Sequence, residues 1–448
     1  MKSKYFSFAA LLCLAAAAPL TSCGGEDDTD PTGAKIVTIW VHKNEQDDEG
    51  KVYKQIQTQF NNEGHALKNG QTVKMSISFY GSTLETKIDG SVLTNKLPDI
   101  IAVDSSDVTA KANAGIIVPF DDYITGEEKN SFVDSVIEQG TIDDELYFLS
   151  PMEAPGGVYY NKTMLRAAGY TDADFPTYDN PWSWNDIHAA QMKLKEAGQP
   201  YQIDLKAGFG DDGYMYLYSP LVYSAGGNFG TEDHVTEALT SEEAINGIRQ
   251  LEQFYSDNGI SGSDSPWVYN GTNDKAFSQG VVPFEVYGPW DARTIKKGNS
   301  AVKGNYGIMP YPVYEDGNGN KGDIIASPCG SFGFGITKSS KNLEASSLVL
   351  KYLCGASSSE MLYNAIGTYP TNVELLSSLE DLQSGPEKDL ADYLKANTYT
   401  RPHMVKYPQL KDAYGEVLKY IKLKVNDSDY DLKKQITEQM TKVDNARA

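Results

Sequence analysis

The stretch Lys35-Ile36-Val37-Thr38-Ile39-Trp40-Val41 opens a series of three short apolar runs that decide the fold. Its β-branched and aromatic residues are typical of a β-strand. Residues 73–79 (VKMSISF) alternate apolar and polar side chains, which predicts a second strand. Residues 99–103 are apolar at nearly every position and predict a third. A strand that is apolar on both faces is typical of a parallel sheet covered by helices on both sides.

Helical patterns fill the gaps between these strands. From about residue 49 to residue 62, Val52, Ile56 and Phe60 fall on one helical face, and a second helix is expected from about residue 83 to residue 95. Strand, helix, strand, helix, strand in this order is α/β architecture. A chain of 448 residues is too long for one core, so we expect two or three lobes.

Later segments continue the alternation. Ser183-x-x-Asp186 has the pattern of a capping box and predicts a helix that ends near Gly198. A further helix is expected over residues 241–258, with Gly259 after it. A strand over 333–337 and a helix over 343–353 complete the prediction.

The N-terminus has the features of a secretory signal. Lys2 and Lys4 precede an apolar run from about residue 5 to residue 20, which is shorter than the ~20 apolar residues of a membrane-spanning helix. The sequence Leu20-Thr21-Ser22-Cys23 resembles the lipobox of bacterial lipoproteins. The resemblance implies removal of residues 1–22 and attachment of diacylglycerol, with acyl chains such as palmitate, to Cys23. Residues 23–34 are rich in Gly, Pro, Thr and acidic residues, and predict a flexible tether.

The net charge and the cysteines limit the possible partners. A formal charge of −22 at pH 7 repels phosphate backbones, so we expect no nucleic acid partner. Beyond Cys13 and Cys23 only Cys329 and Cys354 remain, and whether they form a disulfide is left open. No cluster has zinc-ligand spacing, so we expect neither a metal nor a cofactor.

Short motifs in a consistent order carry a resemblance to a known family. They are Ile39-Trp40, Pro98-Asp99-Ile100-Ile101, Tyr159-Tyr160-Asn161-Lys162, Pro181-Trp182-Ser183-Trp184, Ser224-Ala225-Gly226-Gly227, Ala276-Phe277-Ser278-Gln279-Gly280, Tyr287-Gly288-Pro289-Trp290, Tyr306-Gly307-Ile308-Met309-Pro310, Gly335-Ile336-Thr337-Lys338 and Gly367-Thr368-Tyr369-Pro370-Thr371. Together they resemble the extracellular solute-binding lipoproteins of bacterial ABC importers, in the family that includes maltose-binding protein.

This resemblance implies a two-lobed, periplasmic-binding-protein-like α/β fold with strands that cross between the lobes and a ligand cleft. Lobe 1 is expected to comprise residues 35–151 and about 332–385, and lobe 2 residues 152–331 and about 386–448. The implied function is binding of a carbohydrate outside the cytoplasm and its delivery to an ABC transporter permease, by a monomer that is lipid-anchored to the cell membrane and is not an enzyme.

A carbohydrate site needs aromatic faces for the sugar ring and planar polar groups for its hydroxyls. The resemblance places Trp290 in the cleft, presented by Gly288 and Pro289, with core packing as the alternative. Asp291 either takes hydroxyls or caps the following helix. Tyr214 and Tyr216 either contact sugar or form one face of a packed strand, since tyrosines alternate there.

Further candidates follow the predicted strands or match positions that contact ligand in the family. For Asn44 and Glu45 in the first loop, and for Glu153, exposure to solvent is the alternative. These candidates are Asn44, Glu45, Asp104, Ser105, Glu153, Gly227, Ser331 and Tyr414. In contrast, Trp182 and Trp184 open a helix and are expected to be structural.

Other motifs do not support another activity. The segment from Asp316 to Gly322 differs from a calcium loop, because its glycine is one position late and Ser327 stands where the bidentate glutamate belongs. No Gly-x-Ser-x-Gly elbow is present. The alternatives that stay open are a surface-anchored glycan-degrading enzyme, a sugar sensor that partners a membrane kinase, and a polyol or glycerophosphodiester in place of sugar.

Overall fold

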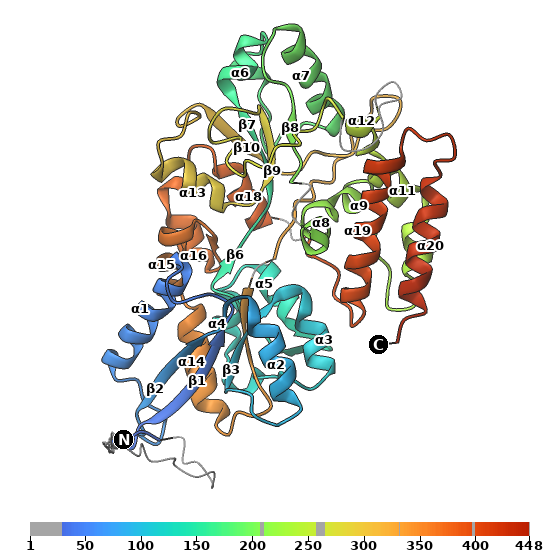
Figure 1. The fold of residues 1–448 in the computed structure, drawn as a ribbon. Helices are drawn as coiled ribbons and strands as arrows, with labels where there is room; N and C mark the ends of the chain where they lie inside the picture. The colour runs from blue at the N-terminus through green and yellow to red at the C-terminus, as the bar shows by residue number, and fades with distance from the viewer. Residues whose placement is uncertain (1–28, 207–209, 257–264, 331, 397–398, 448) are drawn as a thin grey trace, which may run out of the picture.

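The computed structural model describes residues 29–206, 210–256, 265–330, 332–396 and 399–447. The predicted signal, Cys23, Gly259 and Ser331 lie outside the described residues. Figure 1 shows two lobes, each built around its own sheet, with extended segments running between them.

The first sheet contains the three strands predicted from the sequence. Its order is β11-β3-β1-β2, where β1 (Lys35–Val41) lies between its parallel neighbours β2 (Val73–Phe79) and β3 (Ile100–Asp104). Ile39 is opposite both Ile77 and Ile100, so the apolar sides of the strands coincide. The edge strand β11 (Phe332–Ile336) pairs antiparallel with β3 and comes from far along the chain.

Helices cover this sheet as its apolar strands require. The sheet packs against α1 (Asp48–Glu63) and α14 (Leu343–Cys354). Val52, Ile56 and Phe60 on α1 are buried, as predicted. The helix predicted over 83–95 is shorter, with a 3₁₀ turn η1 (Gly81–Thr83) before α2 (Leu84–Val92). After β3 come the 3₁₀ turn η2 (Ser105–Asp107) and α3 (Val108–Asn113).

The second sheet has the order β10-β7-β9-β8. Its strands are β7 (Gly157–Asn161), β8 (Ile203–Asp204), β9 (Phe284–Tyr287) and β10 (Tyr306–Met309). Beside it lie α6 (Lys162–Ala167) and α7 (Trp184–Glu196). The predicted capping box of α7 is present, because Ser183 Oγ accepts from the Asp186 amide while the Asp186 carboxylate accepts from the Ser183 amide at 2.8 Å. Trp184 is buried in the core, as expected of a structural tryptophan.

A helical group completes the second lobe. It comprises α8 (Gly210–Tyr218), α9 (Pro220–Ser224), α10 (Val235–Leu239), α11 (Glu242–Arg249), α12 (Glu252–Tyr255), α19 (Tyr407–Lys424) and α20 (Leu432–Asp444). Two expectations are corrected here. The helix predicted over 241–258 divides into α11 and α12, and the tyrosines at 214, 216 and 218 lie on a helix and not on a strand.

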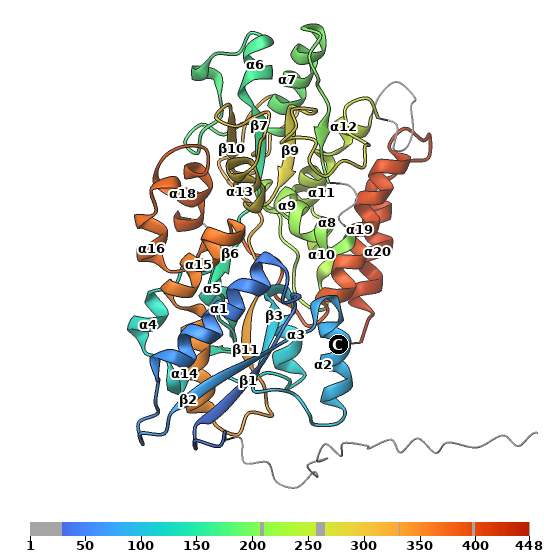
Figure 2. The same cartoon turned by 60° about the vertical axis from the view of Figure 1, so that its left-hand side comes forward.

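Further short elements surround the junction and the first sheet. They are α4 (Gly126–Asn130), α5 (Asp134–Gly140), β4 (Thr141–Ile142), β5 (Glu145–Leu146), α13 (Trp290–Lys297), α15 (Ala356–Ile366), α16 (Val373–Ser378), α17 (Glu380–Gln383) and α18 (Lys388–Ala396), with η3 (Asp121–Tyr123) and η4 (Asp172–Asp174). Figures 1 and 2 both place α15 and α16 on one side of the junction and α8 and α19 on the other.

The chain passes between the lobes at β6 (Met152–Glu153), which pairs with β12 (Tyr369–Pro370) and leads to β7. A second segment, residues 326–330, runs back toward β11. It contacts a third segment around Thr400, because Cys329 and Thr400 form an isolated parallel β-bridge. We keep the lobe boundaries near residues 151, 331 and 385 as a prediction. Among the described residues, no helix combines the length and the apolar character needed to span a membrane.

Candidate functional site

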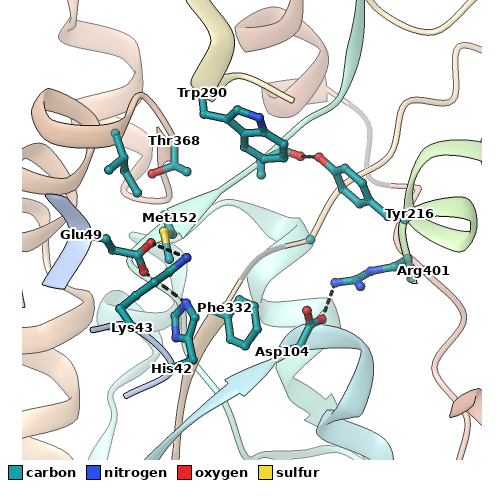
Figure 3. A pocket seen from close by; sticks show the side chains of 14 residues that line it. His42, Lys43, Glu49, Asp104, Met152, Tyr216, Trp290, Phe332, Thr368 and Arg401 are labelled. Carbon is teal, nitrogen blue, oxygen red and sulfur yellow. Dashed lines mark hydrogen bonds and ion pairs between the residues drawn. The ribbon is translucent and has the colours of Figure 1, made fainter. Parts of the chain in front are cut away.

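A cavity of about 490 Å³ lies between the two sheets, and segments from both lobes line it (Figure 3). Its lining combines aromatic rings, paired charges and glycines. The lining residues are His42, Lys43, Glu49, Asp104, Met152, Ala154, Gly213, Tyr216, Trp290, Gly330, Phe332, Ile366, Thr368 and Arg401. The cavity therefore lies beyond the carboxyl ends of β1 and β3, where open α/β sheets bind ligands.

A cluster of charges follows β1. Glu49 is buried at the start of α1, and its carboxylate lies 3.3 Å from His42 Nε2 and 3.2 Å from Lys43 Nζ. Burial acts to raise the pKa of Glu49, but His42 and Lys43 outweigh it and hold that pKa below its ordinary value. The Tyr53 hydroxyl donates to the same carboxylate at 3.0 Å. The result is an ionised carboxylate that holds His42 and Lys43 at the cavity wall.

A second ion pair follows β3. Arg401 Nη2 lies 2.5 Å from Asp104 Oδ1 and donates to Ser105 Oγ at 3.1 Å. Asp104 also accepts from the backbone and the hydroxyl of Ser106, at 3.1 and 2.8 Å. Burial acts to raise the pKa of Asp104, yet Arg401 and Ser106 hold it below its usual range. Gly330 is required here, since a Cβ would lie 2.8 Å from Arg401 Nη2 and its φ is +132°.

Aromatic rings form the opposite wall. Trp290 begins α13 and stays partly exposed to the cavity. A Cβ on Gly288 would meet the indole ring at 2.2 Å, so only glycine permits this turn. The ring of Tyr216 lies 6.5 Å from that of Trp290 at 25°. The Tyr216 hydroxyl donates to the carbonyl of Ala154, which fixes the ring against the crossing segment.

A third aromatic surface lies on the side of the first sheet. Phe332 stacks on His42 with ring centroids 3.7 Å apart and planes 9° from parallel. His42 is itself largely buried, with its side chain 9% exposed. The cavity thus has apolar ring faces on both walls, beside hydrogen-bonding groups whose charges are paired.

The crossing segments form the floor. Met152 and Ala154 line the cavity, while Glu153 between them faces away and is fully buried. Its carboxylate accepts from Gln139 at 2.6 Å and from the Gly330 amide at 2.9 Å. Burial raises the pKa of Glu153. Glu153 therefore joins two crossing segments from behind the cavity and does not reach into it.

Three of the predicted site residues meet at this cavity: Trp290, Asp104 and Tyr216. Ser105 lies directly beside them as a partner of Arg401. Ser331 lies outside the described residues. The structure thus brings together one candidate from the first sheet and two from the second lobe.

The structure places the other candidates elsewhere. Asn44 and Glu45 are exposed, and Glu45 pairs with Lys54 at 3.3 Å. Tyr414 is fully buried in the core of the helical group, where its hydroxyl donates to the Tyr218 carbonyl at 2.8 Å. It was expected near the ligand, but the apolar face of α19 packs inward and carries it into that core.

Three more candidates serve packing or a separate charge cluster. Tyr214 is buried against Tyr218, with ring centroids 6.3 Å apart. Gly227 lies against α11, where a Cβ would be 2.9 Å from Ala244 Cα. Asp291 does not cap α13, because it lies inside the first turn, and it is buried beside Glu285.

Several lining residues were missed by reasoning from the sequence, chiefly His42, Lys43, Glu49, Phe332 and Arg401. His42 and Lys43 directly follow β1, so the rule that sites form at strand ends points to them. Arg401 offers no such signal, because its partner Asp104 lies 297 positions away.

The structure also answers two questions left by the sequence. Cys329 and Cys354 are both buried free cysteines. Asp316 accepts from the amides of Asn318 and Asn320 at 2.8 Å, which makes its segment a hairpin loop. In the part of the chain that the structure describes, no group of three His, Cys, Asp or Glu side chains is arranged to hold a metal ion.

Comparison with known proteins identifies the family. A model of the family described as "Bacterial extracellular solute-binding protein" matches residues 44–358, which is more than half of the chain. The chain belongs to this family. A putative binding protein of Brucella abortus is 26% identical over 250 residues, 53% of this chain and 54% of the relative. The chain thus spans about half the length of such curated relatives.

Two further comparisons extend over more of the chain. The maltodextrin-binding protein MdxE of Bacillus subtilis is 22% identical over 371 residues, which cover 82% of this chain and 80% of the relative. The crystal structure of the cyclic alpha-maltosyl-1,6-maltose binding protein from Arthrobacter globiformis superposes with a TM-score of 0.73 at 20% identity, covering 92% of this chain and 99% of that one. The two-lobed solute-binding fold expected from the sequence is thereby confirmed.

Proposed function

We propose that this solute-binding protein binds a carbohydrate in the interlobe cavity and delivers it to an ABC transporter permease. The observation that carries the proposal is that the rings of Trp290 and Tyr216 share one cavity with the ion pairs Glu49–Lys43 and Asp104–Arg401. Aromatic faces pack against the C–H faces of a sugar ring, while carboxylates and guanidinium groups hydrogen-bond its hydroxyls. The names of relatives, which include a maltodextrin-binding protein, support the same ligand class.

The mechanism is binding coupled to closure of the lobes. Asp104 and His42 approach the ligand from the first sheet, and Trp290 and Tyr216 from the second lobe. Only a closed arrangement lets both sets contact one molecule, so the ligand shifts the population toward the closed form. The closed form then docks on the permease, and other chains hydrolyse ATP. We assign no catalytic residue and no bond-making step to this chain.

We further propose that the mature chain begins at Cys23 and is anchored by lipid to the cell membrane, on its extracytoplasmic side, as a monomer. The support is the lipobox-like sequence before the Gly- and acid-rich segment. The predicted tether over residues 23–34 is corrected at its end, because Asp30 pairs with Lys74 on β2 at 2.6 Å and Ala34 is buried. Cys23→Ala is expected to yield a folded protein that leaves the membrane fraction, because Cys23 precedes both predicted lobes in the sequence. A variant that stays in the membrane fraction as firmly as the natural protein would contradict the anchor.

Native mass spectrometry of freshly purified protein tests the ligand, because a slowly dissociating sugar co-purifies. Titration calorimetry with maltose, maltotriose and maltotetraose follows. Saccharide mass in the native complex, or binding of these probes with no shortening after long incubation, supports the proposal. Retention of a glycerophosphodiester, or hydrolysis of maltotetraose, would overturn it.

A further inference from the structure

A second cavity of about 290 Å³ continues the first one along the cleft. The two share His42, Asp104 and Phe332, so they meet at the His42–Phe332 ring stack. Its complete lining is His42, Gly81, Ser82, Leu84, Glu85, Asp104, Ser106, Asp107, Phe332 and Lys411. We call it the second compartment.

The second compartment is also formed by both lobes. His42 follows β1, Ser82 follows β2 in η1, and Asp107 follows β3 in η2. Lys411 comes from α19 in the helical group. The second compartment therefore continues along the same sheet edge as the main cavity, and α19 lines its opposite side.

One acid in the compartment is not matched by a protein donor. Glu85 pairs with Lys111 at 2.6 Å, and Asp104 pairs with Arg401. In contrast, the Asp107 carboxylate accepts no hydrogen bond within the described part of the chain. Burial, followed by repulsion from Asp104, raises the pKa of Asp107 to about 6, while Lys111 and Lys411 oppose this and Glu85 adds to it.

Such an arrangement is costly unless a ligand supplies donors. A partly buried carboxylate with no hydrogen bond loses hydration without compensation. Hydroxyl groups are donors of the right kind, and Ser82 and Ser106 add small polar groups beside Asp107. Phe332 lines both cavities and gives them a shared apolar wall.

We propose that the second compartment is a ligand subsite that receives further rings of the same sugar, with Asp107 as the acceptor of their hydroxyls. The natural ligand is then an oligosaccharide that passes the His42–Phe332 stack. This inference rests on the proposed function, since it requires sugar in the main cavity.

Titration calorimetry with maltose and maltotetraose tests the proposal through the ratio of the two affinities. Ser82 is exposed at the edge of the second compartment, so Ser82→Tyr is expected to fill it without disturbing the core. Ser377→Tyr, at an exposed position on α16 that lines neither compartment, is the matched control. Asp107→Asn removes the charge while keeping the shape.

The natural protein is expected to bind maltotetraose about tenfold or more tightly than maltose. Ser82→Tyr and Asp107→Asn should each reduce this ratio severalfold, and Ser377→Tyr should leave it unchanged. Equal affinity for the two sugars in the natural protein, or an undiminished ratio in Ser82→Tyr, would overturn the subsite while the sugar proposal stands. Failure to bind either sugar would count against the sugar proposal itself, and the subsite would fall with it.

Discussion

At the scale of single residues, Trp290 connects the structure to the proposed function most directly. Its ring is partly exposed to the cavity, while that of Trp184 is 1% exposed in the core. Trp290→Ala should therefore lower sugar affinity about 30- to 1,000-fold, equivalent to ~2–4 kcal/mol, with little change in melting temperature. Trp184→Ala is the control and should cost ~3–5 kcal/mol of stability. Calorimetry and thermal melts on both variants separate the two roles, and unchanged affinity in Trp290→Ala would remove Trp290 from the site.

Asp107 allows a test that needs no ligand. Its pKa of about 6 in the folded protein exceeds its ordinary value of 3.8, so the folded state binds more protons than the unfolded state between these values. Stability is then lost as the pH rises through this window, and the full penalty applies above pH 6. Asp107→Asn should raise the free energy of unfolding by about 1–3 kcal/mol at pH 7.5 and hardly at all below pH 4.

Denaturant titrations at the two pH values measure this difference. Asp122→Asn, at an exposed position of η3, should show no such gain. A stabilising substitution that weakens oligosaccharide binding would indicate that the acid is kept for function. Equal stability of Asp107→Asn and the natural protein at pH 7.5 would contradict the expected penalty.

Residue types identified part of the site in advance, for a physical reason. Trp290 stands in a Gly-Pro-Trp turn and Asp104 ends an apolar strand, so local sequence marks both. Arg401 could not be found in this way, because only the tertiary fold brings it to Asp104. Tyr414 was misplaced for the same reason, since its position on α19 does not reveal which face is buried.

At the scale of elements, α8 shows why one tyrosine pattern was ambiguous. Tyrosines at alternate positions suit a strand, but on a helix the first and third share one face and the second points away. Tyr214 and Tyr218 indeed pack together, whereas Tyr216 lines the cavity. The three strands of the first sheet were predictable, because each is a short run rich in apolar residues and amphipathic helical patterns separate the runs.

Gly227 tests whether a predicted site residue serves packing. It directly contacts α11, and an added Cβ would lie 2.9 Å from Ala244 Cα and 3.0 Å from its amide nitrogen. Gly227→Ala should therefore destabilise the protein by ~1–3 kcal/mol through overpacking. Its sugar affinity, measured where the variant is folded, should stay near that of the natural protein. Gly226→Ala is an unsuitable control because its φ is +85°, whereas Gly317→Ala meets open space and should melt normally.

At the scale of the whole molecule, length and family resemblance predicted two lobes, but not which side chains connect them. Arg401 makes one such connection. It is buried, pairs with Asp104 at the end of β3, and lies over the Tyr216 ring at 5.8 Å. It therefore connects the first sheet to α8 beside the cavity. The attraction between Arg401 and Asp104 weakens if water enters, because water raises the local dielectric constant.

Arg401→Ala should consequently favour an open arrangement. Removing the guanidinium leaves Asp104 desolvated and without its cation, and opening the cleft lets water reach that carboxylate. Small-angle scattering should show a larger radius of gyration without sugar, and calorimetry a lower affinity, because closure costs more. Arg401→Lys should partly restore both, since it keeps the charge but not the planar geometry. Arg166→Ala, which breaks an exposed pair with Asp172, is the control and should change neither. If Arg401→Ala melts lower but scatters as the natural protein does, then Arg401 stabilises the fold without holding the lobes together.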